Sequence, residues 1–468
     1  MPNIKISRKI FAKLPARKLF SRLNRFVLKS GHKQIDFVFV PFSYLSQKNP
    51  MRYRSKHRLA LGAILMLFAL QPVFVSISFA ALQDQMSTGF RGESALLQAE
   101  AITAGWINLF DGRTLLGWKA ESDADWHVDD HAIWVTAGQP GLLRTTSQFS
   151  DFELSLEFLA DVETNSGVFI RTSPKPKSPA DDCYEINIIR PGLHDFATGS
   201  IVARSKGESA GHPDGENWHS MRIIADGARI VVEVDGKQVV DFTDENPLER
   251  GFIGLQLNKG RVGFRNIRLR PLSMESLVDD GSPGNWNQEK LGGSIAEFSA
   301  EEKCLKLTGG PGQLESRESF GDFVLQARCR SDRAGTNSGI FFRCMPGSDM
   351  MGYECQIDNR QKSPDDNTPE EAGTGAIFRR TIARQVVARD GEWFTMTIAA
   401  CGPHVSVWVD GIHVTDWSDT RPPNENPRRG LRLDAGTIML QGHDPKTAVS
   451  FQHLKAVELR PRWPIPKE

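Results

Sequence analysis

The chain has 468 residues, a length that predicts two or three domains, each large enough for a hydrophobic core. Hydrophobic residues at 40% and charged residues at 24% are near ordinary globular usage, which argues against wholesale disorder and a multi-span membrane protein. The 57 Lys and Arg balance 57 Asp and Glu, and a net charge of zero argues against a protein built around nucleic acid or an anionic surface.

The charge is unevenly distributed along the chain. Residues 1–58 form a basic leader with 15 Lys and Arg and one acid, so this leader carries +14 and the rest of the chain carries −14. The apolar run 59–80 follows and ends in Ser78-Phe79-Ala80, with small residues at −3 and −1. This order is typical of a secretory signal that is cleaved after Ala80. We therefore expect an exported protein, in the periplasm, at the cell surface or outside the cell.

Three other interpretations of this region stay open. The segment 59–82 has 24 residues, enough to span a bilayer as an uncleaved anchor, although polar residues and a proline weaken its second half. A start at Met51 would give a signal of normal proportions. Alternatively, residues 1–50 form a cytoplasmic arm that binds nucleic acid or anionic lipid. We expect no nucleic-acid partner, and membrane contact only through the signal or anchor.

After a polar linker at 81–104, the chain repeats itself. The segment DFELSLEFLADVETNSGVFIR (151–171) corresponds to DFVLQARCRSDRAGTNSGIFFR (322–343), and CYEINI (183–188) corresponds to GYECQI (352–357). The order of these segments and of further pairs is kept, which indicates a duplicated domain. We place the first copy at 105–271, a linker at 272–285 and the second copy at 286–463.

The segments of both copies alternate with a period of two, as in Leu154, Leu156 and Phe158. Asp235-Gly236 and Asp410-Gly411 have the residue types of tight hairpin turns. No helix-period segment of any length follows the leader. These features predict an all-β chain with two tandem antiparallel β-sandwich domains of the jelly-roll type.

Six cysteines fit an exported protein without proving it, and five of them lie in the second half of the chain. A Cys344–Cys355 bridge and free buried thiols are both compatible with the sequence. No Cys or His spacing indicates zinc, and the HExxH, GxxxxGK[ST] and GxGxxG motifs are absent, so we expect neither a metal nor a cofactor. Ser209 matches a G-x-S-x-G elbow but lies in a polar loop, so we do not expect it to be a nucleophile.

Alternation also sorts the strand faces. Tyr184, Ile186 and Ile188 share a predicted core face, which turns Glu185 and Asn187 to the opposite side. The same rule applied to the other strands of both copies gathers a recurring set of arginine, carboxylate and amide side chains on one sheet surface. Such a surface is usually the wet outer face of a sandwich. It also has the groups of a sugar site, because amides and carboxylates bind hydroxyls while aromatic rings stack on C–H faces.

An ordered set of motifs carries a family resemblance. The set comprises WINLFDGRTLLGW (106–118), WHVDDHAI, NSGVFIR, YEI, IGLQL and FRNIRL in the first copy, and NSGIFFR, YECQIDN, TGAIF and LQGHD in the second. It resembles the 3-keto-disaccharide hydrolase family, a 3-keto-glucoside 1,2-lyase/hydratase domain with a concanavalin-like jelly-roll fold. The first copy departs from the pattern with LQLNKG, the second lacks the LFDG…GW opening, and Val202 and Phe378 replace an aromatic hydroxyl.

The resemblance implies a secreted protein that cleaves glycosides of a sugar oxidised at C3, by elimination and then hydration. Glu185 and Glu354 are the base candidates, Arg171 and Arg343 would bind the enolate or a hydroxyl, and His443 is an alternative acid or base. The candidate substrate-binding residues are Asn187, Gln256, Gln356, Asp358, Gln441, Trp218 and Trp393.

Three alternatives accompany this assignment. The Glu–Arg pairs would instead be cross-strand ion pairs on a solvated sheet. The two sandwiches would be non-catalytic carbohydrate-binding modules whose duplication gives avidity at the cell surface. A weaker option is a structural envelope protein. A closed cavity holding Glu with Arg would favour the enzyme, whereas an open aromatic platform would favour the binding modules.

Overall fold

The computed structural model describes residues 97–208, 210–278, 284–363 and 366–461, together with the two-residue strands β1 (Lys29–Ser30) and β2 (Lys33–Gln34). The chain divides into two compact units, Met1–Phe79 and Ala80–Glu468. The predicted signal segment and Ser209 lie outside the described residues. Within the described residues, no helix combines the length and the apolar character that crossing a membrane requires.

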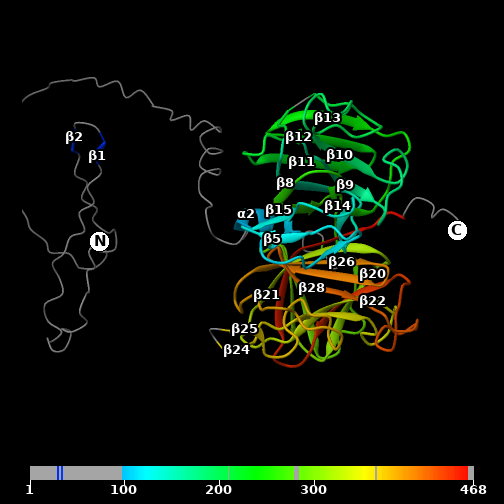
Figure 1. Cartoon of the computed structure of the whole chain (residues 1–468). Helices are drawn as coiled ribbons and strands as arrows, with labels where there is room; N and C mark the ends of the chain where they lie inside the picture. Colours follow the sequence, from blue (N-terminus) through cyan, green and yellow to red (C-terminus); the bar gives the residue numbers. More distant parts are fainter. Residues whose placement is uncertain are drawn as a thin grey trace, which may run out of the picture. The chain divides into compact units, whose positions relative to one another are not determined.

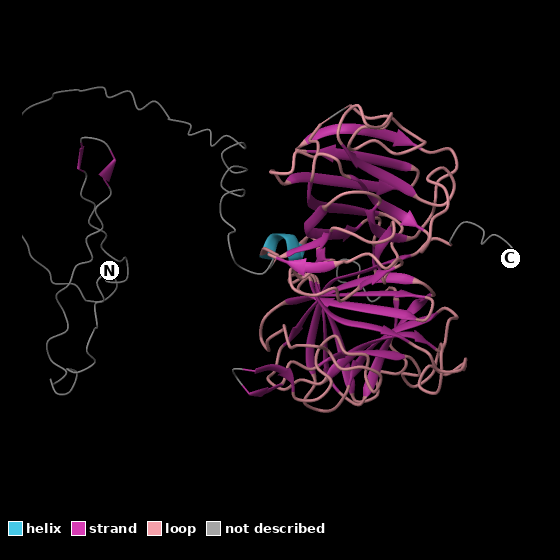
Figure 2. Ribbon diagram, viewed as in Figure 1, coloured by secondary structure: helices cyan, strands magenta, loops and turns pink. Residues whose placement is uncertain are grey.

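The first copy folds as a sandwich of two antiparallel sheets, preceded by the short helix α2 (Ala99–Thr103) (Figures 1 and 2). Its five-stranded sheet has the order β10 (Tyr184–Ile189), β9 (Asn165–Thr172), β14 (Phe252–Leu257), β7 (Gly141–Thr145) and β4 (Trp118–Ala120). Its eight-stranded sheet has the order β13 (Lys237–Thr243), β12 (Arg229–Val234), β11 (His219–Asp226), β8 (Phe152–Ala160), β15 (Val262–Pro271), β6 (Ala132–Val135) and β5 (His127–Asp129), with β3 (Ile107–Asn108) pairing with β15.

The second copy repeats this architecture (Figure 2). Its five-stranded sheet has the order β17 (Trp286–Asn287), β20 (Gly312–Phe320), β29 (Gly436–Gly442), β22 (Ser338–Cys344) and β23 (Tyr353–Ile357). Its eight-stranded sheet has the order β18 (Ser294–Ser299), β19 (Cys304–Gly309), β30 (Ala448–Glu458), β21 (Phe323–Ser331), β26 (Phe394–Cys401), β27 (His404–Val409) and β28 (Ile412–Ser418), with β16 (Glu275–Ser276) pairing with β30. The hairpin β24 (Gln361–Ser363) and β25 (Asp366–Pro369) stands apart from both sheets.

The predicted all-β fold is confirmed, and the alternation explains why the sheets pack. The side chains predicted to face inward, such as Tyr184, Ile186 and Ile188, are buried in one continuous apolar cluster between the two sheets of the first copy. Asp235-Gly236 joins β12 to β13 with positive φ angles of 50° and 74°, as a two-residue hairpin of this kind requires. All six cysteines are buried free thiols, so the Cys344–Cys355 bridge does not form.

The two copies contact each other through the eight-stranded sheet of the second copy. The indole of Trp408 on β27 donates a hydrogen bond to the carbonyl of Asn108 on β3 at 2.9 Å, and its ring joins the apolar core cluster of the first copy. Gln326 on β21 donates to the carbonyl of Gly105 at 2.8 Å. These contacts use one sheet of the second copy, and its five-stranded sheet remains the layer that carries the candidate site.

Candidate functional site

The two candidate base residues occupy equivalent positions on the last strands of the five-stranded sheets. Glu185 lies on β10 and Glu354 on β23, and both side chains point away from the core, as alternation predicts. A glycine opposite each glutamate leaves room for its side chain. A Cβ added at Gly339 would lie 3.2 Å from the Glu354 Oε1, and one added at Gly167 would lie 3.3 Å from the Glu185 Cγ. The NSG motif therefore provides space for the carboxyl groups.

The TG(S/A)I motif forms the next layer of each site. Its backbone runs beside the glutamate-bearing strand, where the amide of Gly375 donates to the Gln356 carbonyl at 2.9 Å and the amide of Phe378 donates to the Glu354 carbonyl at 2.9 Å. In the first copy the amide of Val202 donates to the Glu185 carbonyl at 2.9 Å in the same way. The residues that follow the motif are therefore held next to the glutamate in both copies.

The second copy has a cavity of about 240 Å³ around Glu354, which we call the second-copy cavity. Four predicted residues line it together: Glu354, Gln356, Gln441 and His443. Gln356 donates through Nε2 to the Asn337 Oδ1 at 2.7 Å, and the Oε1 atoms of Gln356 and Gln441 are buried without a hydrogen-bond partner among the described residues. Two unpaired acceptor oxygens beside a carboxyl group suit the hydroxyl donors of a sugar.

Three arginines that the sequence interpretation did not single out also line the second-copy cavity: Arg379, Arg380 and Arg428. Within the part of the chain that the structure describes, none of them forms an ion pair with a carboxylate. The Arg379 guanidinium carbon lies 5.3 Å from the centre of the Phe378 ring. Arg380 donates to the backbone carbonyl of Arg428 at 2.8 Å. The cavity therefore combines one carboxyl group with three guanidinium groups that form no ion pair with it.

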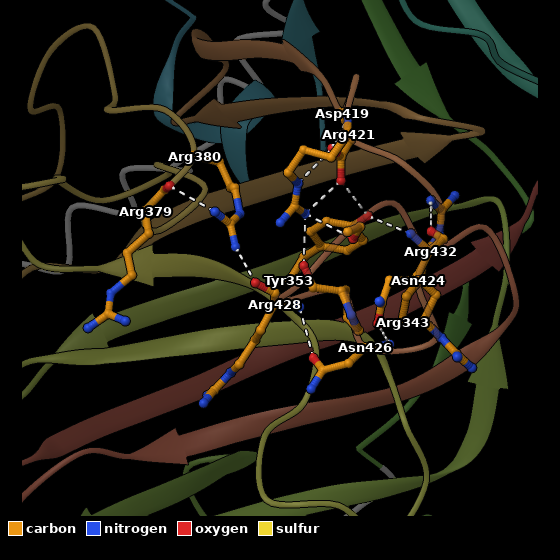
Figure 3. A network of polar contacts seen from close by, with 12 residues as sticks. Arg343, Tyr353, Arg379, Arg380, Asp419, Arg421, Asn424, Asn426, Arg428 and Arg432 are labelled. Atoms are coloured by element: carbon orange, nitrogen blue, oxygen red, sulfur yellow. Dashed lines mark hydrogen bonds and ion pairs between the residues drawn. The ribbon is translucent and has the colours of Figure 1, made fainter.

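A polar network holds the arginines in place (Figure 3). The hydroxyl of Tyr353 donates to the Asp419 Oδ2 at 2.8 Å, and Arg421 donates to both oxygens of the same carboxylate at 2.9 and 2.7 Å. Arg421 also donates to the carbonyls of Pro427 and Gly430. Figure 3 shows the side chains of Arg379 and Arg428 extending away from this network. The network fixes the backbone of the 419–435 loop and leaves these two guanidinium groups free to meet a ligand.

The first copy has a larger cavity of about 420 Å³, which we call the first-copy cavity. Of the predicted residues, Glu185 and Gln256 line it, and the Gln256 Oε1 again has no hydrogen-bond partner among the described residues. Exposed Lys175 and Lys177 of a proline-rich loop stand at its rim. Repeat alignment places Ala203 where the second copy has Arg379, so the guanidinium closest to the TG(S/A)I motif is missing.

Both glutamates have raised pKa values. Burial raises the pKa of Glu354 to about 7, and the nearby charges of Arg428, His443 and Arg379 partly oppose this shift. Burial likewise raises the pKa of Glu185 to about 7, against a hydrogen bond from Gln256. A carboxyl group with a pKa near 7 can accept a proton from a weak carbon acid and return it at neutral pH.

The predicted location of Arg171 and Arg343 on the glutamate-bearing face is wrong. Both have a positive φ, 47° and 48°, and this left-handed backbone breaks the strand alternation and turns the side chain inward. The Arg171 guanidinium is buried against Asp151 at 2.8 Å, and Arg343 is buried against Asp322 at 2.8 Å. Neither lines a cavity, so neither can bind an enolate there.

These buried pairs are contacts between the copies. The second oxygen of Asp151 accepts a hydrogen bond from Arg460 of the second copy, and that of Asp322 accepts one from Arg250 of the first copy at 2.7 Å. Each copy therefore sends one arginine to the buried aspartate of the other. Arg171 and Arg343 recur in the two copies as parts of this interface and not as parts of a sugar site.

Four further candidates lie away from the cavities. Asp358 forms a bidentate ion pair with Arg360, and the Asn187 amide donates to the Phe196 carbonyl at 2.6 Å. The Trp218 ring packs edge-on against Trp134 and under a guanidinium, and Trp393 lies near two others. Neither tryptophan lines the first-copy or the second-copy cavity, and the sugar-stacking role of Trp218 and Trp393 stays a prediction.

The missed arginines had a signal in the repeat alignment. The segment between the strands that end at Thr243 and begin at Phe252 has 8 residues, whereas its counterpart at 419–435 has 17. This longer segment contains Arg421, Arg428 and Arg432. The described residues contain no group of three His, Cys, Asp or Glu side chains suited to a metal ion. Comparing the copies for gained charges, and not only for shared motifs, would have identified the second-copy cavity.

Fold and cavities together define a tandem β-sandwich protein with a glutamate–amide cavity in each copy. A family model of the 3-keto-alpha-glucoside-1,2-lyase-like domain matches residues 105–270 and 273–456. The chain therefore belongs to this family and contains two copies of its domain, and the family match supports a carbohydrate-active protein.

Several solved structures are similar to one copy at a time. Two proteins from Parabacteroides distasonis, described as candidate glycosyl hydrolases, are 20% and 25% identical, with TM-scores of 0.35 and 0.31. The matches cover 39% and 36% of this chain and 100% and 99% of those chains. A carbohydrate-binding module from Bacillus subtilis is 16% identical with a TM-score of 0.26, and the match covers 33% of this chain and 95% of the module. No curated protein matches the chain.

Proposed function

We propose that the second copy cleaves glycosides of a 3-keto-sugar, in an exported protein. The observation that carries this proposal is the second-copy cavity, where a carboxyl group with a pKa of about 7 lies among guanidinium groups and unpaired amide oxygens. Membership of the family supplies the substrate class.

The chemistry follows from the ketone. A carbonyl at C3 acidifies the C2–H bond, so the Glu354 carboxylate takes that proton and the electrons form an enolate. The enolate then collapses, the C1–O bond to the anomeric substituent breaks, and a C1=C2 double bond forms. Glu354, now protonated, returns that proton to the leaving oxygen, and His443, which lines the same cavity, is the alternative acid. Addition of water across the double bond returns a hydrogen to C2 and places a hydroxyl on C1, which completes net hydrolysis.

The remaining groups have separate tasks. Positive charge from Arg428 and Arg379 acts on the enolate oxygen as its charge develops, because both lie close enough to influence the Glu354 carboxylate. The free Oε1 atoms of Gln356 and Gln441 accept hydrogen bonds from sugar hydroxyls. The half-buried Phe378 ring supplies an apolar wall. These roles replace those predicted for Arg171 and Arg343.

The non-catalytic binding-module alternative fits less well. An open aromatic platform would be its mark, but Trp218 and Trp393 lie outside both cavities. The first copy retains Glu185 and Gln256 without the arginines, so a role in holding the carbohydrate is the function that its cavity favours. The proposal therefore assigns cleavage to one copy and binding to the other.

The test is release of the aglycone from a 3-keto-glucoside by Glu354→Gln, Glu185→Gln and the double variant. We expect Glu354→Gln to lower kcat/KM by on the order of a thousandfold, because it removes the general base, whereas Glu185→Gln remains within a few-fold of the unaltered protein. Glu425→Gln, which alters an exposed glutamate on the 419–435 loop, is the matched control and should retain full activity. Full activity of the double variant would refute the proposal.

A further inference from the structure

The second-copy cavity holds more positive charge than the proposed reaction needs. A neutral 3-keto-sugar develops at most one negative charge, on the enolate oxygen, and only transiently. Three guanidinium groups line the cavity, against a single carboxyl group that is about half protonated at pH 7. Because arginine remains charged in proteins, three guanidinium groups and about half a carboxylate leave the cavity with a net charge between roughly +2 and +3 before any ligand enters.

The excess charge is built into the second copy and absent from the first. Arg204 and Arg380 are equivalent in the repeat alignment, but Arg204 is tied to Asp244 at 2.6 Å and to the carbonyl of Ala180 at 2.6 Å. In the second copy Arg421, from the longer loop, takes the equivalent carboxylate of Asp419. Arg380 is thereby released toward the cavity, where it lines the wall and holds the Arg428 backbone.

Among the described residues, the guanidinium groups of Arg379 and Arg428 form no ion pair with a carboxylate. Arg379 and Arg428 are both exposed. Arg379 lies near the Phe378 ring and Arg428 near the Phe341 ring, and both influence the charge of Glu354. Keeping like charges together without carboxylate partners costs free energy, which an anionic ligand would recover. Planar guanidinium groups match the oxygen pairs of carboxylate and sulfate groups and form two hydrogen bonds to them at once.

We propose that the sugar bound in the second-copy cavity carries an anionic substituent, a carboxylate or a sulfate ester, that Arg379 and Arg428 bind. This inference rests on the proposed function for its setting and specifies its substrate class. Gln356, Gln441 and Glu354 contact the hydroxyl side of the ring, while its C3 carbonyl and its anionic group both lie toward the arginines. Arg380 acts as a positioning residue, because it reaches the ligand through the backbone of Arg428.

Binding of unoxidised sugars tests this inference without any turnover. Isothermal titration calorimetry on the full chain would compare methyl glucuronide, glucose 6-sulfate and methyl glucoside, with inorganic sulfate as the control ligand. We expect each anionic sugar to bind at least tenfold more tightly than the neutral one, because charge-assisted hydrogen bonds discriminate more strongly than neutral ones. Raising the salt from 50 to 500 mM should reduce that preference, since the arginines are exposed.

The variants Arg379→Ala and Arg428→Ala should each weaken binding of the anionic sugars about tenfold. Neither variant should change the affinity for methyl glucoside, the neutral sugar. Arg429→Ala is the matched control, since Arg429 is the exposed neighbour of Arg428 and does not line the cavity. Circular dichroism and the thermal midpoint verify that each variant folds. A preference for only one anionic sugar supports the inference and identifies the group. Equal affinity for all three sugars, equal losses in Arg429→Ala, or inorganic sulfate binding as tightly as the sugar sulfate would overturn it.

Turnover separates this inference from the proposed function. If neutral and anionic 3-keto-glycosides are cleaved equally well, the proposed cleavage stands and the anionic substrate class is wrong. If neither is cleaved but the arginine-dependent preference is found, the anionic sugar site stands and the cleavage proposal fails.

Discussion

The two cavities differ although the sheets that carry them are the same. Each copy has a glutamate on the last strand of its five-stranded sheet, a glycine on the adjacent strand that makes room for it, and a glutamine on the strand after that, β14 or β29. The loops around these shared residues have diverged. The first copy connects β13 to β14 with 8 residues, whereas the second connects β28 to β29 with 17. A duplicated sheet has thus kept its framework while its loops have changed the charge of the site.

One exchange of partners explains most of that change. Asp244 in the first copy neutralises Arg204, the third residue after the TG(S/A)I motif. Asp419 in the second copy is satisfied by Arg421, two residues further along the chain, so the equivalent Arg380 is not needed there. A local ion pair in a loop therefore decides whether a distant arginine belongs to the framework or to the cavity.

Removing Arg421 should convert the second copy toward the first, and this is the largest effect that we expect in the comparison. In Arg421→Ala, the freed Asp419 carboxylate attracts Arg380, and the 419–435 loop loses two hydrogen bonds to its carbonyls. Misplacement of Arg428 should lower kcat/KM on a 3-keto-glycoside by roughly ten- to a hundredfold. The measurement is steady-state release of the aglycone.

Arg229→Ala is the control for this prediction, because it breaks an exposed Arg–Asp pair of the first copy at 2.7 Å and touches neither cavity. A normal rate in Arg421→Ala would mean that the partner exchange does not position the site.

The common framework could be predicted from the sequence, because it depends on regular alternation. Burial of Tyr184, Ile186 and Ile188 turned Glu185 to the outer face, and the same rule placed Glu354 correctly. The rule failed at Arg171 and Arg343, where a positive φ interrupts the strand. No residue type at these positions announces that conformation, since arginine ordinarily avoids it.

The differences between the copies could not be predicted in this way. Arg379 and Arg428 lie in loops, where no periodicity relates sequence to direction. The position of Arg428 depends on the loop that Arg421 holds through Asp419, Pro427 and Gly430, and no strand pattern encodes these contacts. Residue type alone favoured sugar stacking for Trp218 and Trp393; in the structure Trp218 packs against Trp134, and both indole rings lie beneath arginine side chains.

The pH dependence of cleavage is an effect of intermediate size that distinguishes Glu354 from Glu185. A general base works only when deprotonated, and the pKa of Glu354 is about 7, so kcat/KM should fall about tenfold between pH 8 and pH 6 and level off above pH 8. In Glu185→Gln the profile should be unchanged, because Glu185 has no part in the cleavage step. A profile that is flat from pH 6 to pH 8 in the unaltered protein would exclude Glu354 as the base.

The smallest effect concerns stability and applies to both copies. Burial raises the pKa of Glu354 to about 7, above the value of 4.5 that is usual for a glutamate in water. The folded chain therefore holds this proton more tightly than the unfolded chain does. The group therefore stabilises the fold below pH 4.5 relative to higher pH, and that contribution is lost as the pH rises through 7. Replacing the charged carboxylate by an amide should consequently raise stability at pH 8 and have little effect at pH 5.

We expect a gain of about 1 kcal/mol at pH 8, below the ~3 kcal/mol that the full pKa difference would give, because the side chain is partly solvated. Glu185→Gln should behave alike, since burial raises the pKa of Glu185 to the same value. Thermal unfolding of both variants and the unaltered protein at pH 5 and pH 8 makes the measurement. If both variants gain stability at pH 8 but only Glu354→Gln loses cleavage, then both copies retain a carboxylate that burial destabilises. Only the arginine-rich copy then uses its carboxylate for cleavage. If the variants and the unaltered protein are equally stable at both pH values, neither carboxylate is destabilised by burial.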